Sequence, residues 1–256
     1  MADILLTHSY HLYYDRKQLR KMQPYAPLGT LYAAALLRQH GYTVAVFDTM
    51  LQDPASGFPE ALKRHQPRVV AVYEDNFNFL SKMCLTRMRE VAFAMAQQAR
   101  AAGAVPIVNG SDASDHAADY LGAGFEAVLL GEAEWTLLDT ANALSRATAD
   151  LESISGLAFL ADAGRLRRSA PRPIMRDVDV LPLPARDLID MDAYAAAWRQ
   201  THGRFSANLV ASRGCPFRCN WCAKPIYGNN YHARSPESVA EEMRRLKYQF
   251  GAEHLW

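Results

Sequence analysis

The sequence has few of the features that mark secreted, membrane-spanning or nucleic-acid-binding proteins. It contains only four cysteines in 256 residues, and three of them fall within eight positions, so they do not form a disulfide framework. The first residues show no signal peptide, and no apolar run approaches the roughly 18–20 residues that span a bilayer. The net charge is only +1. We expect a cytoplasmic protein with neither a membrane nor a nucleic-acid partner.

Strand-like and helical patterns alternate along the first part of the chain. Apolar segments typical of strands occupy residues 3–7, 43–47, 68–73, 105–108 and 127–130. Helical patterns occupy residues 27–40, 81–102, 114–121 and 133–147. Repeated strand–helix units with apolar strands indicate a parallel sheet that is covered on both faces. The predicted fold class is α/β, with a doubly wound, Rossmann-like domain over residues 1–148, here called the front domain.

Ligands of doubly wound domains bind beyond the carboxyl ends of the strands. His8 and His11 follow the first expected strand. Candidate ligand-contacting residues at this edge are His8, Glu74, Asp75, Asn76, Asn109, Gly110, Ser111, Gly131 and Glu132. Each has a plainer alternative as a hydrogen-bonded loop residue, a helix-capping residue or part of a tight turn.

The chain changes character after residue 148. Residues 154–168 have the pattern of a hairpin, and four prolines between residues 171 and 184 indicate an extended connection, so residues 149–203 are predicted to be a connector. A short helix is expected at 190–200. A strand over 207–212 leads into the cysteines, a helix capped by Ser235 follows, and a strand is expected at 253–256.

Three cysteines form the motif Cys215-Pro-Phe-Arg-Cys219-Asn-Trp-Cys222. Three thiolates on one tight loop can hold three irons of a [4Fe–4S] cluster, which leaves the fourth iron with an open coordination position. A structural zinc site with His232 as the fourth ligand, or a chance grouping, are the alternatives. The remaining Cys84 falls in the long helix at 81–102, where we expect it to be a small buried hydrophobic residue.

The segment from Ser212 to Cys222, including the aromatic Trp221, resembles the signature of the radical S-adenosylmethionine superfamily. The resemblance implies that S-adenosylmethionine chelates the open iron and lies beside Trp221. It also implies that an external electron donor such as flavodoxin or ferredoxin reduces the cluster, and that the reduced cluster cleaves the cofactor to a 5′-deoxyadenosyl radical.

Four further stretches resemble the subgroup that carries a cobalamin-binding-type front domain. They are Tyr25-Ala-Pro-Leu-Gly29, Gly131-Glu-Ala-Glu134, the connector Val178–Asp187 and Arg234-Ser-Pro-Glu237. The resemblance implies that cobalamin contacts the candidate residues at the strand ends. It also implies that residues 204–256, here called the end segment, form the first part of a partial TIM-type (β/α) barrel.

Two features depart from that subgroup's pattern. The Asp-x-His-x-x-Gly motif, which places a histidine beneath cobalt in some cobalamin proteins, is absent, because His116 follows Asp115 directly. This favours binding without a histidine ligand, or a domain that has lost the cofactor. In addition, 34 residues follow Cys222, whereas a full barrel takes about 250 residues. The resemblance therefore predicts a truncated or fragmentary chain.

The function that the resemblance implies is cobalamin-dependent methyl transfer to a small-molecule substrate, with the methyl group carried on cobalt and the substrate activated by the adenosyl radical. A radical cyclase or rearrangement enzyme, and a cofactor-binding fragment without activity, are the alternatives. A tRNA methylthiotransferase is disfavoured, because the front domain of that group carries its own cysteine set and here there is only Cys84.

Overall fold

The computed structural model of the chain describes residues 1–75, 84–145, 150–161, 164–217, 219 and 226–256. Its strands are β1 (Ile4–Thr7), β2 (Val44–Phe47), β3 (Val69–Tyr73), β4 (Val105–Asn109), β5 (Ala127–Leu129), β6 (Leu157–Ala161), β7 (Arg165–Arg168), β8 (Ser206–Ala207), β9 (Ser212–Arg213), β10 (His232–Ala233) and β11 (His254–Leu255). Its α-helices are α1 (Arg16–Lys21), α2 (Leu28–Gln39), α3 (Pro54–His65), α4 (Leu85–Ala101), α5 (Ser111–Asp115), α6 (Ala117–Gly122), α7 (Glu134–Leu144), α8 (Met191–His202) and α9 (Pro236–Tyr248).

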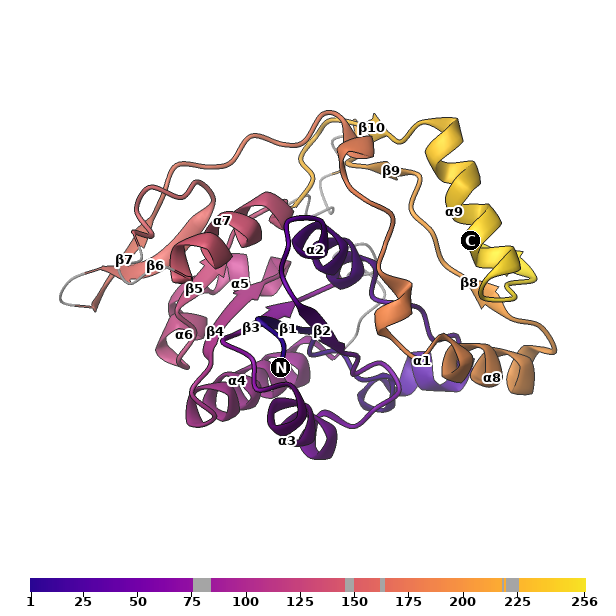
Figure 1. Ribbon diagram of the computed structural model, residues 1–256, viewed down its shortest axis with the longest axis horizontal. Helices are drawn as coiled ribbons and strands as arrows, with labels where there is room; N and C mark the ends of the chain where they lie inside the picture. Colours follow the sequence, from indigo (N-terminus) through magenta and orange to yellow (C-terminus); the bar gives the residue numbers. More distant parts are fainter. Residues whose placement is uncertain (76–83, 146–149, 162–163, 218, 220–225) are drawn as a thin grey trace.

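A sheet with the strand order β2-β1-β3-β4-β5-β6-β7 forms the centre of the front domain (Figure 1). The first five strands in this order run parallel, with Ile4 of β1 opposite both Val44 of β2 and Val69 of β3. The chain therefore builds outward from β1 to β2 and then returns to place β3 on the other side of β1. This order confirms the predicted doubly wound α/β fold.

The hairpin of β6 and β7 is confirmed, but it is not a separate piece of the connector. β6 pairs antiparallel with β5, with Leu129 opposite Leu157, so the hairpin extends the front sheet. The edge of β5 offers unpaired backbone groups, and Leu157 and Ala158 are fully buried when β6 covers that edge. The four residues of β7 at the outside remain exposed.

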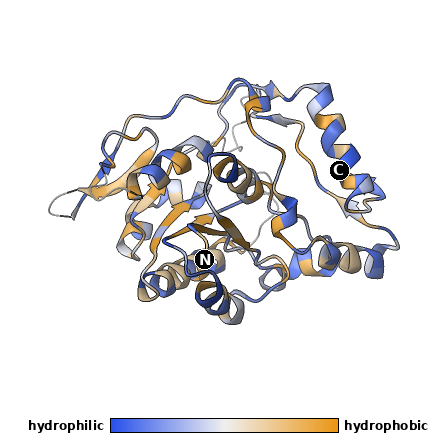
Figure 2. Ribbon diagram, in the orientation of Figure 1, coloured by the Kyte–Doolittle hydropathy of each residue, from blue (hydrophilic) through white to orange (hydrophobic). Residues whose placement is uncertain are grey.

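Apolar side chains alternate between the two faces of the sheet. Leu5 and Val70 pack with residues of α3, α4 and α6 on one face, whereas Leu6 and Ala71 pack with residues of α2 and α7 on the other. Figure 2 shows the resulting concentration of hydrophobic residues in the central strands. In the part of the chain that the structure describes, no helix has both the length and the apolar character that a membrane crossing requires.

The helix α2 forms a layer between the front sheet and the end segment. Every residue from Leu28 to Leu37 is buried, because the helix packs on the sheet through one side and on later parts of the chain through another. Leu36 and Tyr32 lie in an apolar cluster with Leu181 of the connector, and Val210 packs against the same cluster. The end of the chain is thus attached to α2, the helix that precedes β2 (Figure 1).

The end segment contains one β–α–β unit and a short ribbon. β8 and β11 pair in parallel with α9 between them, as expected for the start of a barrel. The expected strand over 207–212 is wrong as a continuous element, because only its two ends pair, as β8 and β9. Between them, the Asn208 carbonyl accepts a hydrogen bond from Arg186 Nη2 at 2.6 Å, and the Asn208 side chain donates to Ala26.

Several helices of the front domain differ from the sequence-based expectation. α1 was not expected, and the helix expected at 114–121 is divided at His116 into α5 and α6. α3 was not anticipated, because Gly57 and Pro59 weaken its helical pattern, but Asp53 caps it and Phe58 is fully buried beneath it. The long helix α4 begins at Leu85 rather than at residue 81. Cys84 is therefore its N-cap and not an interior residue, and it packs partly buried beside an apolar cluster.

Candidate cofactor edge and cluster loop

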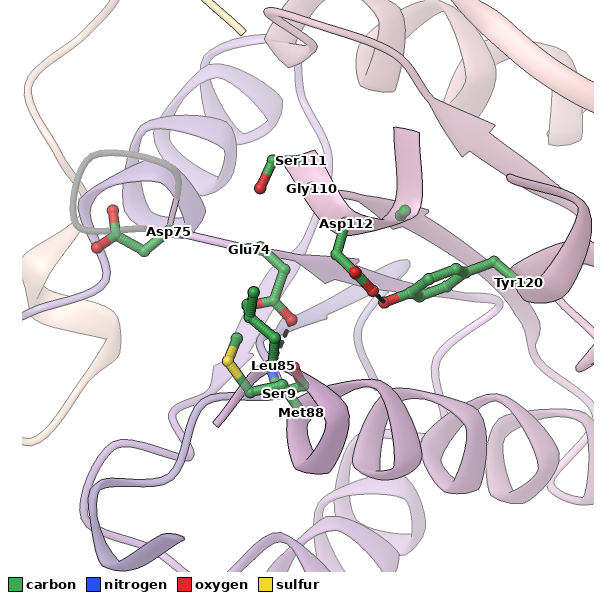
Figure 3. Close-up of a pocket in the computed structure, with 10 residues that line it drawn as sticks. Ser9, Glu74, Asp75, Leu85, Met88, Gly110, Ser111, Asp112 and Tyr120 are labelled. Atoms are coloured by element: carbon green, nitrogen blue, oxygen red, sulfur yellow. Dashed lines mark hydrogen bonds between the residues drawn. The ribbon is translucent and has the colours of Figure 1, made fainter. Parts of the chain in front are cut away.

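The carboxyl ends of β1, β3 and β4 surround a small pocket at the point where the strand order reverses. Figure 3 shows Ser9, Glu74, Gly110 and Ser111 around it, with Met88 of α4 among the residues that line the opposite side. The pocket has a volume of about 30 Å³. Doubly wound folds bind ligands at this position. The structure therefore brings together predicted residues from three separate loops.

Glu74 organises this pocket from within. Its Oε1 accepts a hydrogen bond from the Ser9 amide at 2.9 Å, which ties the end of β3 to the end of β1. A Cβ on Gly110 would lie 3.0 Å from Cγ of Glu74. Glycine at this position therefore allows the close approach of Glu74. The sequence also suggested that Gly110 lets a ligand approach the backbone, and that role remains a prediction.

Asp75 and Asn109 fix neighbouring strand ends. The Asp75 carboxylate accepts a hydrogen bond from the Gly29 amide at 3.3 Å, and so connects β3 to the first turn of α2. The Asn109 amide donates to the carbonyls of Leu129 at 2.9 Å and Gly131 at 3.3 Å, across to the end of β5. Asn76 lies outside the described residues.

His8 is buried in a network of its own. Its Nε2 lies 2.8 Å from the Asp48 carboxylate, and its Nδ1 lies 3.0 Å from Oγ1 of Thr49. Asp48 also accepts a hydrogen bond from the Tyr194 hydroxyl at 2.5 Å, which joins α8 to the front domain. Both ring nitrogens of His8 are thus occupied by protein partners, which favours a structural role over contact with a cofactor.

The two other histidines near this edge also bond to the protein. His11 Nδ1 lies 2.8 Å from the Thr49 carbonyl, and His116 Nδ1 lies 3.1 Å from the Asp112 carbonyl. A bond from Nδ1 to a backbone carbonyl fixes the orientation of each ring and leaves Nε2 as its second nitrogen. Cobalamin binding here without a histidine ligand remains a prediction.

The cluster loop, residues 214–222, begins directly after β9. Cys215 and Cys219 form no disulfide, whereas Cys222 and Trp221 lie outside the described residues. Among the side chains that the structure describes, no three His, Cys, Asp or Glu residues gather in a metal-binding group. With Cys222 not in that set, the three-cysteine site remains a prediction.

Gly214 gives the cluster loop its starting geometry. Its φ of +78° is a conformation that residues with a side chain rarely adopt. A Cβ at this position would lie 1.8 Å from the carbonyl oxygen of Asn230. The loop therefore packs directly on the backbone that returns toward β10, and only glycine fits between the two segments.

Arg213, the residue before Gly214, makes a buried double ion pair with the front domain. Its Nη1 donates to Glu132 and its Nη2 donates to Glu134, each at 2.7 Å, and the arginine is only 3% exposed. The rings of Tyr32 and Tyr227 each lie 5.3 Å from its Cζ, within the range of cation–π attraction. Glu132, predicted from the sequence as a cofactor contact, is here a partner of the cluster loop.

The charges of this group influence one another strongly. Burial and the neighbouring charge of Glu134 raise the pKa of Glu132, while Arg213 acts in the opposite direction. Burial alone would lower the pKa of Arg213, but the charge of Glu134 raises it well above its ordinary value. Arg213 therefore stays protonated and reduces the repulsion between the two buried carboxylates.

A second buried network connects the connector to α9. Glu242 of α9 accepts hydrogen bonds from Arg186 Nη2, at 3.0 Å, and from Arg234. Arg234 also donates to the hydroxyl of Tyr32 at 3.1 Å. All three charged residues are at most 7% exposed. Tyr32 of α2 consequently contacts both networks, through its ring and through its hydroxyl.

Three of the four stretches that resemble the cobalamin-type radical subgroup contribute residues to these two networks. Glu132 comes from the turn after β5, Arg186 from the connector, and Arg234 from the segment that opens α9. The sequence analysis quoted these stretches but assigned no role to Arg213, Glu134 or Glu242. The available signal was the presence of arginines and glutamates inside stretches that are otherwise apolar or rich in proline.

The curated relatives of this chain are methyltransferases and cyclases, and no protein-family model matches it. The chain is 35% identical to an uncharacterized methyltransferase of Pyrococcus horikoshii over 131 residues, which are 51% of this chain and 27% of that protein. It is 28% identical to the hopanoid C-3 methylase of Methylococcus capsulatus over 225 residues, or 86% of this chain and 40% of the methylase. An anaerobic magnesium-protoporphyrin IX monomethyl ester cyclase of Synechocystis is 28% identical over 126 residues, or 49% and 24% of the two chains.

Two solved enzymes share the fold over nearly the whole chain. The cobalamin-dependent S-adenosylmethionine radical enzyme OxsB, with aqua-cobalamin and S-adenosylmethionine bound, gives a TM-score of 0.74 at 16% identity and covers 100% of this chain and 33% of its own. The radical S-adenosylmethionine methyltransferase TsrM of Kitasatospora setae gives 0.68 at 22% identity, with 96% and 45% covered. The chain therefore has the fold of these cobalamin-dependent and radical S-adenosylmethionine enzymes, and its curated relatives are methyltransferases and cyclases.

The chain spans 27% and 40% of the first two curated relatives' lengths. The described residues fit the cofactors of the cobalamin-binding radical proteins in part. Cys215 and Cys219 are thiols outside any disulfide, and Cys215 directly follows the closely packed Gly214, which suits an iron–sulfur cluster. At the strand ends, Ser111 is partly exposed in a pocket of about 30 Å³, close to the space of one water molecule, so the pocket marks this edge of the sheet but does not enclose a cofactor.

Proposed function

We propose that the chain holds a [4Fe–4S] cluster through Cys215, Cys219 and Cys222 and binds S-adenosylmethionine at the open iron. We further propose that cobalamin binds at the carboxyl ends of β1, β3, β4 and β5, and that the protein transfers methyl groups to a small-molecule substrate. The observation that carries this proposal is the buried pairing of Arg213 with Glu132 and Glu134. It connects the segment that enters the cluster loop to the turn beside the proposed cobalamin edge.

When bound, the cluster supplies one electron, received from a donor such as flavodoxin or ferredoxin, that cleaves S-adenosylmethionine to methionine and a 5′-deoxyadenosyl radical, and cobalamin supplies a cobalt that carries methyl groups. The chain's own residues provide the geometry. Gly214 brings the cluster loop onto the returning backbone, and Arg213 joins it to the front domain. Glu74 and Asn109 hold together the strand ends at which cobalamin would bind.

The cluster assignment is tested by anaerobic reconstitution of the full chain with iron and sulfide. We expect about four irons per chain and visible charge-transfer absorption. Cys219→Ala removes one proposed ligand and should abolish both signals. Cys84→Ala is the matched control, because Cys84 caps α4 in the front domain, and it should leave both unchanged. A cluster that survives in Cys219→Ala contradicts the assignment.

The cobalamin assignment is tested by incubating the chain with hydroxocobalamin and removing the excess by gel filtration. Retention near one equivalent supports it, whereas no retention favours a front domain of this fold without the cofactor. Ser111→Trp places a large ring in the pocket from the first residue of α5 and should reduce retention. Asp115→Trp, at the other end of the same helix and outside the residues that line the pocket, is the matched control.

A radical cyclase is the second candidate, because cyclases are among the curated relatives. The two functions differ in the fate of the methyl group of S-adenosylmethionine. With the methyl group isotopically labelled, a methyltransferase transfers the label to cobalamin, whereas a cyclase that uses cobalamin differently does not. A chain that binds both cofactors but cleaves no S-adenosylmethionine under reduction is a cofactor-binding fragment.

A further inference from the structure

The buried residue Arg213 lies two positions before the first proposed cluster ligand, and its side chain reaches away from the loop into the front domain. We propose that Arg213 is a positioning residue for the cluster: its pairing with Glu132 and Glu134 fixes the backbone of Gly214 and Cys215, and so determines how firmly the cluster is held. This inference rests on the proposed function, because it concerns the same cluster.

The side chain of Arg213 has little freedom to move. The carboxylates of Glu132 and Glu134 each accept a hydrogen bond from its guanidinium at 2.7 Å. The rings of Tyr32 and Tyr227 each lie 5.3 Å from its Cζ. A planar fork that donates to two fixed acceptors defines an orientation as well as a distance. The position of the arginine's backbone is therefore set by residues of the front domain.

The acceptors of Arg213 are themselves held in place. The second carboxylate oxygen of Glu132 accepts a hydrogen bond from the Met175 amide at 2.6 Å. The carbonyl of Gly131, one residue earlier, accepts from the Asn109 amide at 3.3 Å. Glu134 begins α7, whose fully buried Leu137 packs on the sheet. The front domain thus offers a rigid base rather than a flexible loop.

The backbone after Arg213 connects this fixed position to the Cys215 thiol. Arg213 is opposite His232 in the β9–β10 ribbon, and Gly214 packs against Asn230 on the returning strand. Because Arg213 is fixed on one side and Asn230 lies on the other, the backbone that leads into Cys215 has little room to move. Outer residues that orient a ligand commonly change metal affinity about 10–100-fold when they are altered.

The Glu242 network provides a matched comparison for a purely structural role. Glu242 is as buried as Arg213, at 2% against 3% exposed, and it also joins the end segment to α2 through Arg234 and Tyr32. It lies on α9, however, and neither of its partners, Arg186 and Arg234, is within two residues of a proposed cluster ligand. Loss of stability alone should therefore be similar in variants of the two networks, whereas an effect on the cluster should be specific to Arg213.

The test compares Arg213→Lys and Glu242→Gln in the reconstituted full chain. Lysine keeps the positive charge but cannot donate in a fork to both glutamates. We expect iron loss to a chelator to be about tenfold faster in Arg213→Lys, with a changed EPR spectrum of the reduced cluster. Glu242→Gln should lower the melting temperature of the cluster-free chain, but its rate of iron loss and its EPR spectrum should match the wild type.

Glu132→Gln gives an independent measurement if Arg213→Lys does not fold, because it changes only one acceptor of the pair. It should also accelerate iron loss, by a smaller factor. Equal rates of iron loss in wild type, Arg213→Lys and Glu132→Gln would overturn the inference while the cluster assignment stands. If the wild-type chain itself holds no four-iron cluster, the proposed function fails first, and the two failures are therefore distinguishable.

Discussion

The front domain and the end segment are held together by different forces. In the front domain, strands of three to five residues are buried by apolar side chains on both faces of the sheet. In the end segment, β8, β9, β10 and β11 have two residues each. Phe205 and Leu246 still pack in an apolar cluster with the front domain, but the buried charges of Arg213, Arg234 and Glu242 add a second set of connections to the rest.

The difference separates contacts that mainly stabilise the fold from contacts that mainly fix the positions of side chains. Apolar burial is non-directional, so the front domain gains free energy without fixing each side chain to one partner. Hydrogen-bonded ion pairs contribute less net free energy but define distances and orientations. A segment that has to place cluster ligands benefits from the second kind of contact. We therefore expect small changes to the buried charged side chains of the end segment to affect its structure more than the loss of apolar area alone implies.

The largest effect is expected from Gly214→Ala. The added Cβ would lie 1.8 Å from the Asn230 carbonyl, so the cluster loop and the returning backbone have to separate. We expect complete loss of the cluster after reconstitution, measured as iron per chain. Gly203→Ala is the matched control, because Gly203 also has a positive φ, of +72°, but has no atom within 4 Å of the added Cβ. It should cost only about 1 kcal/mol, and normal iron content in Gly214→Ala would contradict the structure of this loop.

The next largest effect concerns Glu242→Ala, which leaves Arg186 and Arg234 buried without their shared carboxylate. Breaking a buried pair in this way costs about 3–5 kcal/mol. Chemical denaturation monitored by circular dichroism measures this loss. Leu36→Ala, in the apolar cluster on α2, is expected to cost about 2–5 kcal/mol by creating a cavity. If Glu242→Ala cost less than 1 kcal/mol, the proposed contrast between the two regions would be wrong.

The third effect is a pH dependence that should appear in Arg213→Met. Burial and Glu134 raise the pKa of Glu132, and removal of the arginine should raise it further. The folded state then binds the proton more tightly than the unfolded state. Stability is therefore greatest below the ordinary glutamate pKa, near 4.5, and falls as pH rises through the raised value.

Each additional unit in the pKa of Glu132 costs about 1.4 kcal/mol at neutral pH. Denaturation at pH 5 and pH 7.5 should show a greater loss across this interval in Arg213→Met than in wild type. Tyr73, Tyr227 and Glu134 face the same group, and the charge of Glu134 raises the pKa of Tyr73 in addition to burial, so the tyrosines remain protonated throughout. Parallel stability curves for the two proteins would show that Arg213 does not neutralise this pair.

The smallest effect is expected from Arg38→Ala. Arg38 pairs with Asp187 at 2.7 Å, but the two side chains are 43% and 53% exposed. Exposed pairs of this kind contribute about 0–1 kcal/mol. Thermal unfolding should therefore shift only slightly, and raised salt should reduce the difference between the variant and the wild type. A loss above 2 kcal/mol would show that exposed pairs matter as much here as buried ones.

Local signals in the sequence were sufficient for much of the fold. Ser235 caps α9 as predicted, with its hydroxyl 3.2 Å from the Ser238 amide, because a cap depends on residues only a few positions apart. The apolar strands of the front sheet are confirmed for the same reason. α3 escaped detection because burial of Phe58 and Leu62 outweighs the weak helical preference of Gly57 and Pro59.

The partners of the candidate site could not be derived in the same way. Arg213 and Glu132 are 81 residues apart in sequence, and a single sequence contains no local pattern that pairs them. His8 was a reasonable candidate ligand by position, but Asp48 and Thr49, which follow the neighbouring strand, occupy its ring. Strand-end position predicts which residues gather, whereas their partners depend on the packing of several loops.

EPR spectroscopy of the reduced, reconstituted chain, with and without S-adenosylmethionine, is the most direct test of the proposed cluster. It asks whether Cys215, Cys219 and Cys222 hold a cluster with one open iron. Chelation at the open iron changes the electronic environment of the cluster. We expect a [4Fe–4S]⁺ signal whose g values shift when S-adenosylmethionine is added, and no such signal in Cys219→Ala. A four-iron signal that S-adenosylmethionine leaves unchanged would contradict a cofactor-binding cluster in this chain.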